Sequence, residues 1–168
     1  MLVGEQVVDG KKYKFASSGA LIDASRNWQI SNGVLYYQNK GQRSYKLPSN
    51  GIIIISLKEQ RMWGYKNGKW MATPVTTGKN STPTYPGWFK INSKYRSIYL
   101  TSSTYSSFVS YWMAYSGSSY GIHDASWRDV FGTQSYTYNG SHGCINTPKR
   151  EVKKFYETFS VGTDVWIY

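Results

Sequence analysis

The chain has 168 residues, enough for one full hydrophobic core and a small additional segment. Aromatic residues make up 17% of it, with 16 Tyr and 7 Trp, and this composition favours strands and turns over long helices. The net charge of +11 indicates an anionic partner, either nucleic acid or an anionic cell envelope. A single cysteine excludes an internal disulfide, and no apolar run reaches the length of a membrane span.

The start of the chain lacks the basic segment and the apolar core of a signal peptide. The protein is therefore either cytoplasmic or a piece of a longer chain that is membrane-anchored or secreted. We favour the second interpretation, because the sequence from residue 2 onward reads like the middle of a protein.

Two similar units occupy the N-terminal segment, residues 1–45. Asp9-Gly10 and Asn32-Gly33 are strong hairpin turns 23 residues apart, and each is followed by an aromatic strand. This spacing predicts short β-hairpin repeats stacked in line, and it resembles the cell-wall-binding repeats of secreted bacterial surface proteins. Two ordinary hairpins are an equally good interpretation. The polar stretch 42–50, which contains Pro48, is expected to be a linker.

A second domain is expected over residues 50–168. The β-branched run from Ile52 to Leu57 is typical of a central strand buried on both faces. Asn67-Gly68 predicts a hairpin, residues 76–87 are turn-rich, and 101–107 is expected to be a loop. The other expected strands are at 62–65, 69–75, 88–91, 97–100, 108–115, 120–123 and 165–168.

One helix is expected near the C-terminus. Pro148 suits its first turn, and Gly162 ends it. Between them, apolar residues recur at helical spacing at Val152, Phe155, Tyr156 and Phe159. The fold class is therefore mainly β, with one packed helix and with short β-hairpin repeats in front.

The residues that carry chemistry gather in one window. His123 is followed by 17 residues and then by the motif 141–146, Ser-His-Gly-Cys-Ile-Asn, which holds the only cysteine and the second of two histidines. A thiolate is the attacking form of cysteine, and a neighbouring imidazole can take the thiol proton. Backbone N–H groups at a glycine turn can hold the oxyanion that follows. The window indicates a cysteine-nucleophile site.

Other interpretations of these features are weaker. A zinc site could use His123, His142 and Cys144, but supporting carboxylates are missing. A purely structural cysteine is usually surrounded by apolar residues, whereas this motif is polar and contains a glycine. Nucleic-acid binding rests only on the charge and the aromatic residues, without a recognisable binding motif.

The motif 141–146, with His123 before it, resembles the active-site signature of the L,D-transpeptidases, the YkuD-like catalytic domain. The resemblance continues in order over residues 50–168, through 52–56, 60–65, 75–79, 83–91, 111–113 and 121–124. It implies a YkuD-like β-sandwich of mixed sheets. It also implies an enzyme without a metal or organic cofactor.

The reaction that this resemblance implies is acyl transfer in peptidoglycan. Cys144 would attack the third-residue carbonyl of a tetrapeptide stem, release D-alanine and pass the acyl group to a second stem as a 3→3 cross-link. With water as acceptor, the same site would be an L,D-carboxypeptidase. A non-catalytic wall-binding module is the alternative from another class. The family is also acylated by carbapenems at this cysteine.

The resemblance also implies roles for single residues. Cys144 is the nucleophile, and His123 is the base. A backbone carbonyl is expected to orient His123, because the Asp124 side chain points to the opposite face of a strand. The N–H groups of Gly143 and Cys144, with or without that of His142, are expected to hold the oxyanion. His142 is either a brace or a direct participant, and glycine at 143 allows a close approach to substrate.

The remaining candidates concern the substrate. The insert 124–140 is expected to form a loop over the cleft. Ser141 and Asn146 are expected to brace the motif beside the substrate. The walls of the cleft are expected to come from Tyr111, Trp112, Tyr120, Trp127 and Arg128, although any one aromatic residue here could equally belong to the core. Arg128 could meet a substrate carboxylate.

The expected partners follow from this function. They are the donor and acceptor stem peptides and, because of the basic charge, anionic wall polymers; nucleic acid is not expected. The corresponding location is the extracellular cell wall of a Gram-positive bacterium.

Overall fold

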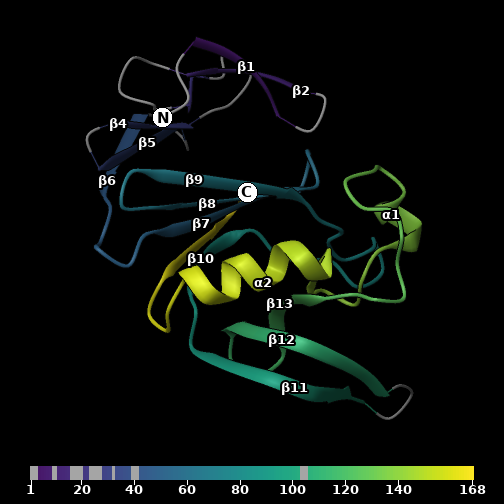
Figure 1. The fold of residues 1–168 in the computed structure, drawn as a ribbon. Coiled ribbons are helices and arrows are strands. Elements are labelled where there is room, and N and C mark those ends of the chain that lie inside the picture. The colour runs from purple at the N-terminus through teal and green to yellow at the C-terminus, as the bar shows by residue number, and fades with distance from the viewer. Residues whose placement is uncertain are drawn as a thin grey trace. The chain divides into compact units, whose positions relative to one another are not determined.

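The computed structural model describes residues 4–8, 11–15, 21–22, 28–31, 33–38, 42–102 and 106–168. The chain forms two compact units (Figure 1). The first comprises Met1–Ser49 with Asn67–Lys69, and the second comprises Asn50–Lys66 with Trp70–Tyr168.

The first unit consists of two three-stranded antiparallel sheets. These are β1 (Gly4–Val8), β2 (Lys11–Phe15) and β3 (Leu21–Ile22), and then β4 (Trp28–Ser31), β5 (Val34–Gln38) and β6 (Gln42–Lys46). Both expected hairpins are confirmed, since Val8 pairs with Lys11 and Ser31 with Val34. The turn residues Asp9, Gly10 and Asn32 lie outside the described residues.

The expected linker is wrong over residues 42–46. These residues form β6, which pairs along its full length with β5, from Gln38 opposite Gln42 to Val34 opposite Lys46. A polar composition does not prevent a strand, because half of the side chains of a strand can face solvent. Only the stretch after Lys46 remains irregular, up to the start of β7.

A five-stranded mixed sheet forms one layer of the second unit. Its order is β10 (Gly87–Lys90), β15 (Asp164–Ile167), β7 (Ile52–Ser56), β8 (Arg61–Lys66) and β9 (Lys69–Pro74). All five residues of β7 are buried, as expected of a central strand, and β15 runs parallel to it. Asn67 and Gly68 have φ of 51° and 77°, the left-handed conformation that an Asn-Gly hairpin needs.

A four-stranded sheet carries the chemistry-bearing residues. Its order is β11 (Ser93–Thr101), β12 (Ser106–Ser116), β13 (Tyr120–Asp124) and β14 (Ile145–Thr147). Only β14 runs parallel to its neighbour, and the sequence did not predict it. The strands β11 and β12 reach into the expected loop 101–107, since Thr101 pairs with Ser106.

Two helices complete the second unit. The expected helix is confirmed as α2 (Lys149–Thr158), and a single turn, α1 (Tyr136–Asn139), lies in the insert 124–140. Figure 1 shows α2 between the two sheets, and its Val152 and Phe155 belong to one core cluster with residues of both. Neither described helix has the length and apolar content that a membrane crossing requires.

Two lysines from the sheets hold the C-terminal end of α2. The Lys94 ammonium donates to the carbonyls of Tyr156 at 2.5 Å and Phe159 at 2.6 Å, and Lys66 donates to that of Thr158 at 2.8 Å. Burial, and then the nearby charge of Lys66, lower the pKa of Lys94. Carbonyls at this end of a helix lack partners within it and carry partial negative charge, so cations stabilise them.

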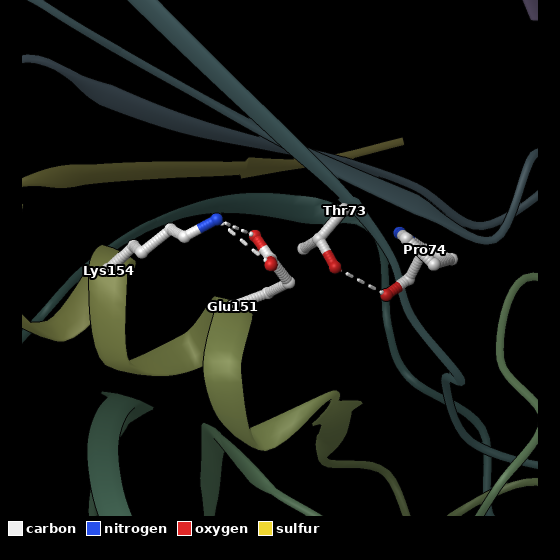
Figure 2. A network of polar contacts seen from close by, with 4 residues as sticks. All are labelled: Thr73, Pro74, Glu151 and Lys154. Carbon is white, nitrogen blue, oxygen red and sulfur yellow. Dashed lines mark hydrogen bonds and ion pairs between the residues drawn. The ribbon is translucent and has the colours of Figure 1, made fainter. Parts of the chain in front are cut away.

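A third lysine, Lys154, makes a different kind of contact. Figure 2 shows Lys154 paired with Glu151, one helical turn earlier, and also draws Thr73 and Pro74 of β9. The Lys154 and Glu151 charges are 2.8 Å apart. Half of the Lys154 side chain is exposed, at 49%. Exposed pairs of this spacing contribute little to stability.

We expect Lys94→Met to lower the free energy of unfolding by about 1.5–3 kcal/mol, the usual contribution of hydrogen bonds to a charged group. Lys154→Met is the matched control, with an expected loss of at most about 0.5 kcal/mol. Urea unfolding of both variants measures the difference. Equal losses would show that the lysine at the end of α2 has no special role.

Candidate active site

The pairing of β13 with β14 brings the two parts of the predicted site together. Ile122 pairs with Ile145 and His123 with Asn146, and Cys144 comes immediately before β14. A cavity of about 310 Å³ opens at this point. Its lining residues are Leu100, Ser107, His123, Trp127, Arg128, Asn139, Gly140, Ser141, His142, Cys144 and Asn146. The cavity therefore contains both the imidazole and the thiol.

A backbone carbonyl orients His123, as expected, and it belongs to Asp124. The Nδ1 atom of His123 lies 2.8 Å from this oxygen. Because a carbonyl only accepts, Nδ1 carries the proton and Nε2 keeps its lone pair. Burial lowers the pKa of His123, against the opposing effect of the Asp124 carbonyl and charge. The imidazole is therefore neutral at pH 7 and able to accept a proton.

The Asp124 carboxylate faces away from this imidazole. Its Oδ1 accepts hydrogen bonds from the N–H groups of Ser110 and Tyr111 on β12, each at 2.8 Å, and Asp124 is almost fully buried. Successive side chains of a strand point to opposite faces, so His123 and Asp124 cannot share one. The carboxylate fixes β12 to β13 behind the site.

An indole supports the imidazole from one side. The Trp112 and His123 rings stack with centroids 5.6 Å apart, and the Trp127 ring lies at 6.0 Å. Trp112 lies close to Gly121, where a Cβ atom would come within 2.7 Å of the indole. The absence of a side chain at 121 thus lets Trp112 occupy this position.

Cys144 is half-buried at the edge of the same cavity. Burial raises the pKa of its thiol to about 11, against the opposing effect of a backbone hydrogen bond at Gly121. Its Sγ donates a long hydrogen bond to the Ser119 carbonyl oxygen, at 3.9 Å. The thiol is therefore protonated at neutral pH, and a base would have to take its proton before it could act as a nucleophile.

The Ser141 hydroxyl makes two hydrogen bonds within the motif 141–146. Its Oγ accepts from the Gly143 N–H at 3.0 Å and donates to the Cys144 carbonyl at 2.5 Å. The Gly143 N–H, expected to serve the oxyanion, is thus already engaged. Gly143 has φ of 109°, and a Cβ there would lie 2.4 Å from the Tyr120 ring. The protein's own packing therefore requires glycine at 143.

Part of the turn-rich stretch packs against the motif 141–146, a contact that the sequence did not predict. We call residues 76–84 the strap. Thr76 and Asn146 exchange two backbone hydrogen bonds of 2.9 Å. The hydroxyls of Thr82 and Thr84 donate to the carbonyls of Ser141 at 2.9 Å and Gly143 at 2.8 Å.

The strap is itself fixed from behind. Gln60 is fully buried; its side chain accepts from the Thr77 N–H at 2.9 Å and donates to the Thr77 hydroxyl at 2.7 Å. In the sequence, the strap stands out only as a turn-rich stretch with several threonines. This composition does not reveal which groups the threonine hydroxyls contact.

The predicted wall residues lie in four different places. Trp127 and Arg128 line the cavity, and Trp112 lies behind the imidazole. Tyr120 and Gly143 line a second cavity of about 100 Å³, together with Tyr115. Tyr111 does not line either of these two cavities, because its ring packs against Tyr156 in the core.

The expected loop 124–140 contributes to the cavity through residues at both of its ends. Arg128 donates to the Asn139 carbonyl at 2.6 Å, which ties the start of the insert to the end of α1. Its Nε is buried and makes no hydrogen bond, and burial lowers the pKa of the guanidinium.

Across the described ranges, no group of three His, Cys, Asp or Glu residues could hold a metal ion, so the zinc interpretation has no geometric support.

Comparison with known proteins agrees with this geometry. Residues 50–167 match the family model YkuD, described as the L,D-transpeptidase catalytic domain. The chain is 35% identical over 96 residues to L,D-transpeptidase 2 of Mycobacterium tuberculosis, covering 50% of this chain and 22% of the relative.

Solved structures of Enterococcus faecium L,D-transpeptidase are also similar. The crystal structure of a cysteine-to-serine mutant matches with a TM-score of 0.67 and 35% identity, over 70% of this chain and 49% of that one. The NMR structure of its catalytic domain matches with a TM-score of 0.65 and 35% identity, over 72% of this chain and 98% of that one. The chain thus spans about a fifth of the curated relative and about half of the longer solved structure. Over residues 50–167 this protein belongs to the YkuD family, as an L,D-transpeptidase catalytic domain.

Proposed function

We propose that this protein forms 3→3 cross-links in peptidoglycan by acyl transfer through Cys144, with release of D-alanine from a tetrapeptide stem. The observation that carries the proposal is the bond from His123 Nδ1 to the Asp124 carbonyl, which leaves Nε2 as a base in the cavity that holds the thiol. The family relationship supports the reaction class.

In the first half-reaction, Nε2 of His123 accepts the thiol proton as Sγ attacks the third-residue carbonyl of the donor stem. The tetrahedral intermediate collapses to a thioester, and the imidazolium returns the proton to the departing amine of D-alanine. In the second half-reaction, an amine of the acceptor stem attacks the thioester and frees the thiol. Water in place of this amine would give an L,D-carboxypeptidase.

The oxyanion donor that we propose is the Cys144 N–H. The Gly143 carbonyl, in the same peptide group, accepts from Thr84 and from the Tyr115 hydroxyl at 3.3 Å. Because a trans peptide points its C=O and N–H in opposite directions, the Cys144 N–H points away from these two residues. The Gly143 N–H could contribute only by giving up its bond to Ser141. His142 lines the cavity and is proposed as a brace of the motif.

Arg128 and Trp127 are proposed to hold the donor stem. The guanidinium uses one N–H bond on the Asn139 carbonyl, and its buried Nε has no partner. Arg128 lines the cavity, and the remaining N–H groups of its guanidinium suit a substrate carboxylate, which accepts from two donors at once. The Trp127 ring, 52% exposed, offers an apolar face beside it.

A second proposal concerns the first unit, residues 1–49. Its two three-stranded sheets carry equivalent hairpins, with Val8 opposite Lys11 and Ser31 opposite Val34, in keeping with a repeat. We propose that this unit binds the wall. The net charge of +11 would add attraction to anionic wall polymers at an extracellular location.

We expect Cys144→Ala to abolish transfer and to leave the fold intact, because the half-buried thiol contributes little to the core. Disaccharide-tetrapeptide incubated with the wild-type protein should yield D-alanine and a cross-linked dimer by mass spectrometry. The variant should yield neither, at an unchanged melting temperature. If the wild type yields neither product and no carbapenem adduct on Cys144, the enzymatic proposal is wrong.

The pH dependence of kcat/KM should show an acid limb below pH 6.5, the ordinary pKa of histidine. Burial lowers the pKa of His123, so the imidazole remains an available base to more acid pH than a free histidine. Activity should fall about tenfold per pH unit below that lowered pKa. An acid limb above pH 6.5 would show instead that the site raises the pKa of His123, against the proposed effect of burial.

Sedimentation with purified sacculi tests the first unit. The full chain should co-sediment, and residues 50–168 alone should remain largely in the supernatant. Added salt should weaken only the contribution of the basic charge. Equal sedimentation of both would place wall binding in the catalytic domain.

A further inference from the structure

We propose that Thr84 is a positioning residue for the oxyanion donor: its hydroxyl fixes the peptide group between Gly143 and Cys144. The inference rests on the proposed function, since it concerns how the Cys144 N–H is aimed. The inference goes beyond the proposed function because it assigns a role to the strap, which supplies neither the base nor the nucleophile.

The Thr84 hydroxyl has a defined direction. It accepts the Gly78 N–H at 2.9 Å and lies 2.8 Å from the Gly143 carbonyl oxygen, at a site where Thr84 is only 6% exposed. A hydroxyl has one proton, and the Gly143 carbonyl can only accept. The proton of Thr84 is therefore committed to Gly143.

A second hydroxyl contacts the same carbonyl. Tyr115 is 5% exposed, and its hydroxyl lies 3.3 Å from the Gly143 oxygen. Burial raises the pKa of this phenol, so that it stays a donor at any pH of interest. The shorter contact, from Thr84, is the stronger constraint.

Gly143 needs such a constraint because its backbone is intrinsically free. Its φ of 109° is a conformation that residues with a side chain rarely adopt, and no side chain limits its rotation. Rotation about its Cα–C bond would turn the carbonyl and the Cys144 N–H together, since they lie in one plane. Bonds to the carbonyl therefore hold the N–H on the opposite side.

The strap provides its own control residue. Thr82 donates to the Ser141 carbonyl at 2.9 Å, but the N–H in that peptide group belongs to His142. The Lys79 N–H also donates to the Ser141 carbonyl, at 3.1 Å. Loss of the Thr82 hydroxyl should therefore leave the direction of the Cys144 N–H bond unchanged.

The test compares two reactions of the same thiol in Thr84→Val, Thr84→Ser and Thr82→Val. Acylation by ertapenem forms a bond from Sγ to the lactam carbonyl carbon, passes through an oxyanion, breaks the C–N bond and moves the thiol proton to nitrogen. Alkylation by iodoacetamide displaces iodide without an oxyanion. Mass spectrometry of timed samples gives both rates, and the melting temperature of each variant is recorded.

Thr84→Val should slow acylation by at least about tenfold, approaching the 10²–10³-fold that loss of an oxyanion donor costs. Its alkylation rate should stay within about twofold of the wild type, because no oxyanion forms. Thr84→Ser keeps the hydroxyl and should restore acylation, and Thr82→Val should stay within about threefold of the wild type.

Three outcomes would overturn the inference. Equal acylation by wild type and Thr84→Val would show that Thr84 does not aim the donor. A parallel loss of acylation and alkylation, or an equal loss in Thr82→Val, would reduce Thr84 to a general structural role. A wild-type protein that ertapenem does not acylate would remove the proposed function itself, and the inference with it.

Discussion

The parallel pairing of β13 with β14 is the constraint on which the site depends. Three residue pairs, from Ile122–Ile145 to Asp124–Thr147, join the strand of His123 to the strand that follows Cys144. Such a short pairing is held by its surroundings: the Asp124 carboxylate binds β12 on one side, and Thr76 pairs with Asn146 on the other. Misregister by one residue would turn His123 to the opposite face, away from Cys144.

Burial then determines the charge state of the pair. It lowers the pKa of His123 and raises that of Cys144 to about 11, and both shifts favour the uncharged forms. In the proposed mechanism, charge therefore develops only as the thiol attacks, when proton transfer produces an imidazolium inside a cavity. The Asp124 carbonyl at 2.8 Å is already directed at the ring and needs no rearrangement to stabilise this charge.

Sequence patterns predicted the features that depend on local chemistry. The run Ile52–Ile55 identified the central strand, and Asn67-Gly68 identified the hairpin. Strand alternation predicted that the Asp124 side chain points away from the face of His123. Features that depend on contacts between distant segments were not predictable. The strap meets the motif through Thr84 and Gly143, 59 residues apart, and the engagement of the Gly143 N–H depends on the position of one hydroxyl. Strand β6 was missed because edge strands can be polar throughout.

The fit between Trp112 and Gly121 restricts how this domain can diverge. A side chain at 121 would meet the indole at 2.7 Å, so it could arise only together with a smaller residue at 112. A smaller residue there would uncover one face of the His123 ring, which now stacks on the indole, and would admit water to it. Water there would weaken the effect of burial and raise the pKa of His123 toward its ordinary value. A side chain at 121 is thus blocked by the indole, and a smaller residue at 112 would leave the imidazole less buried.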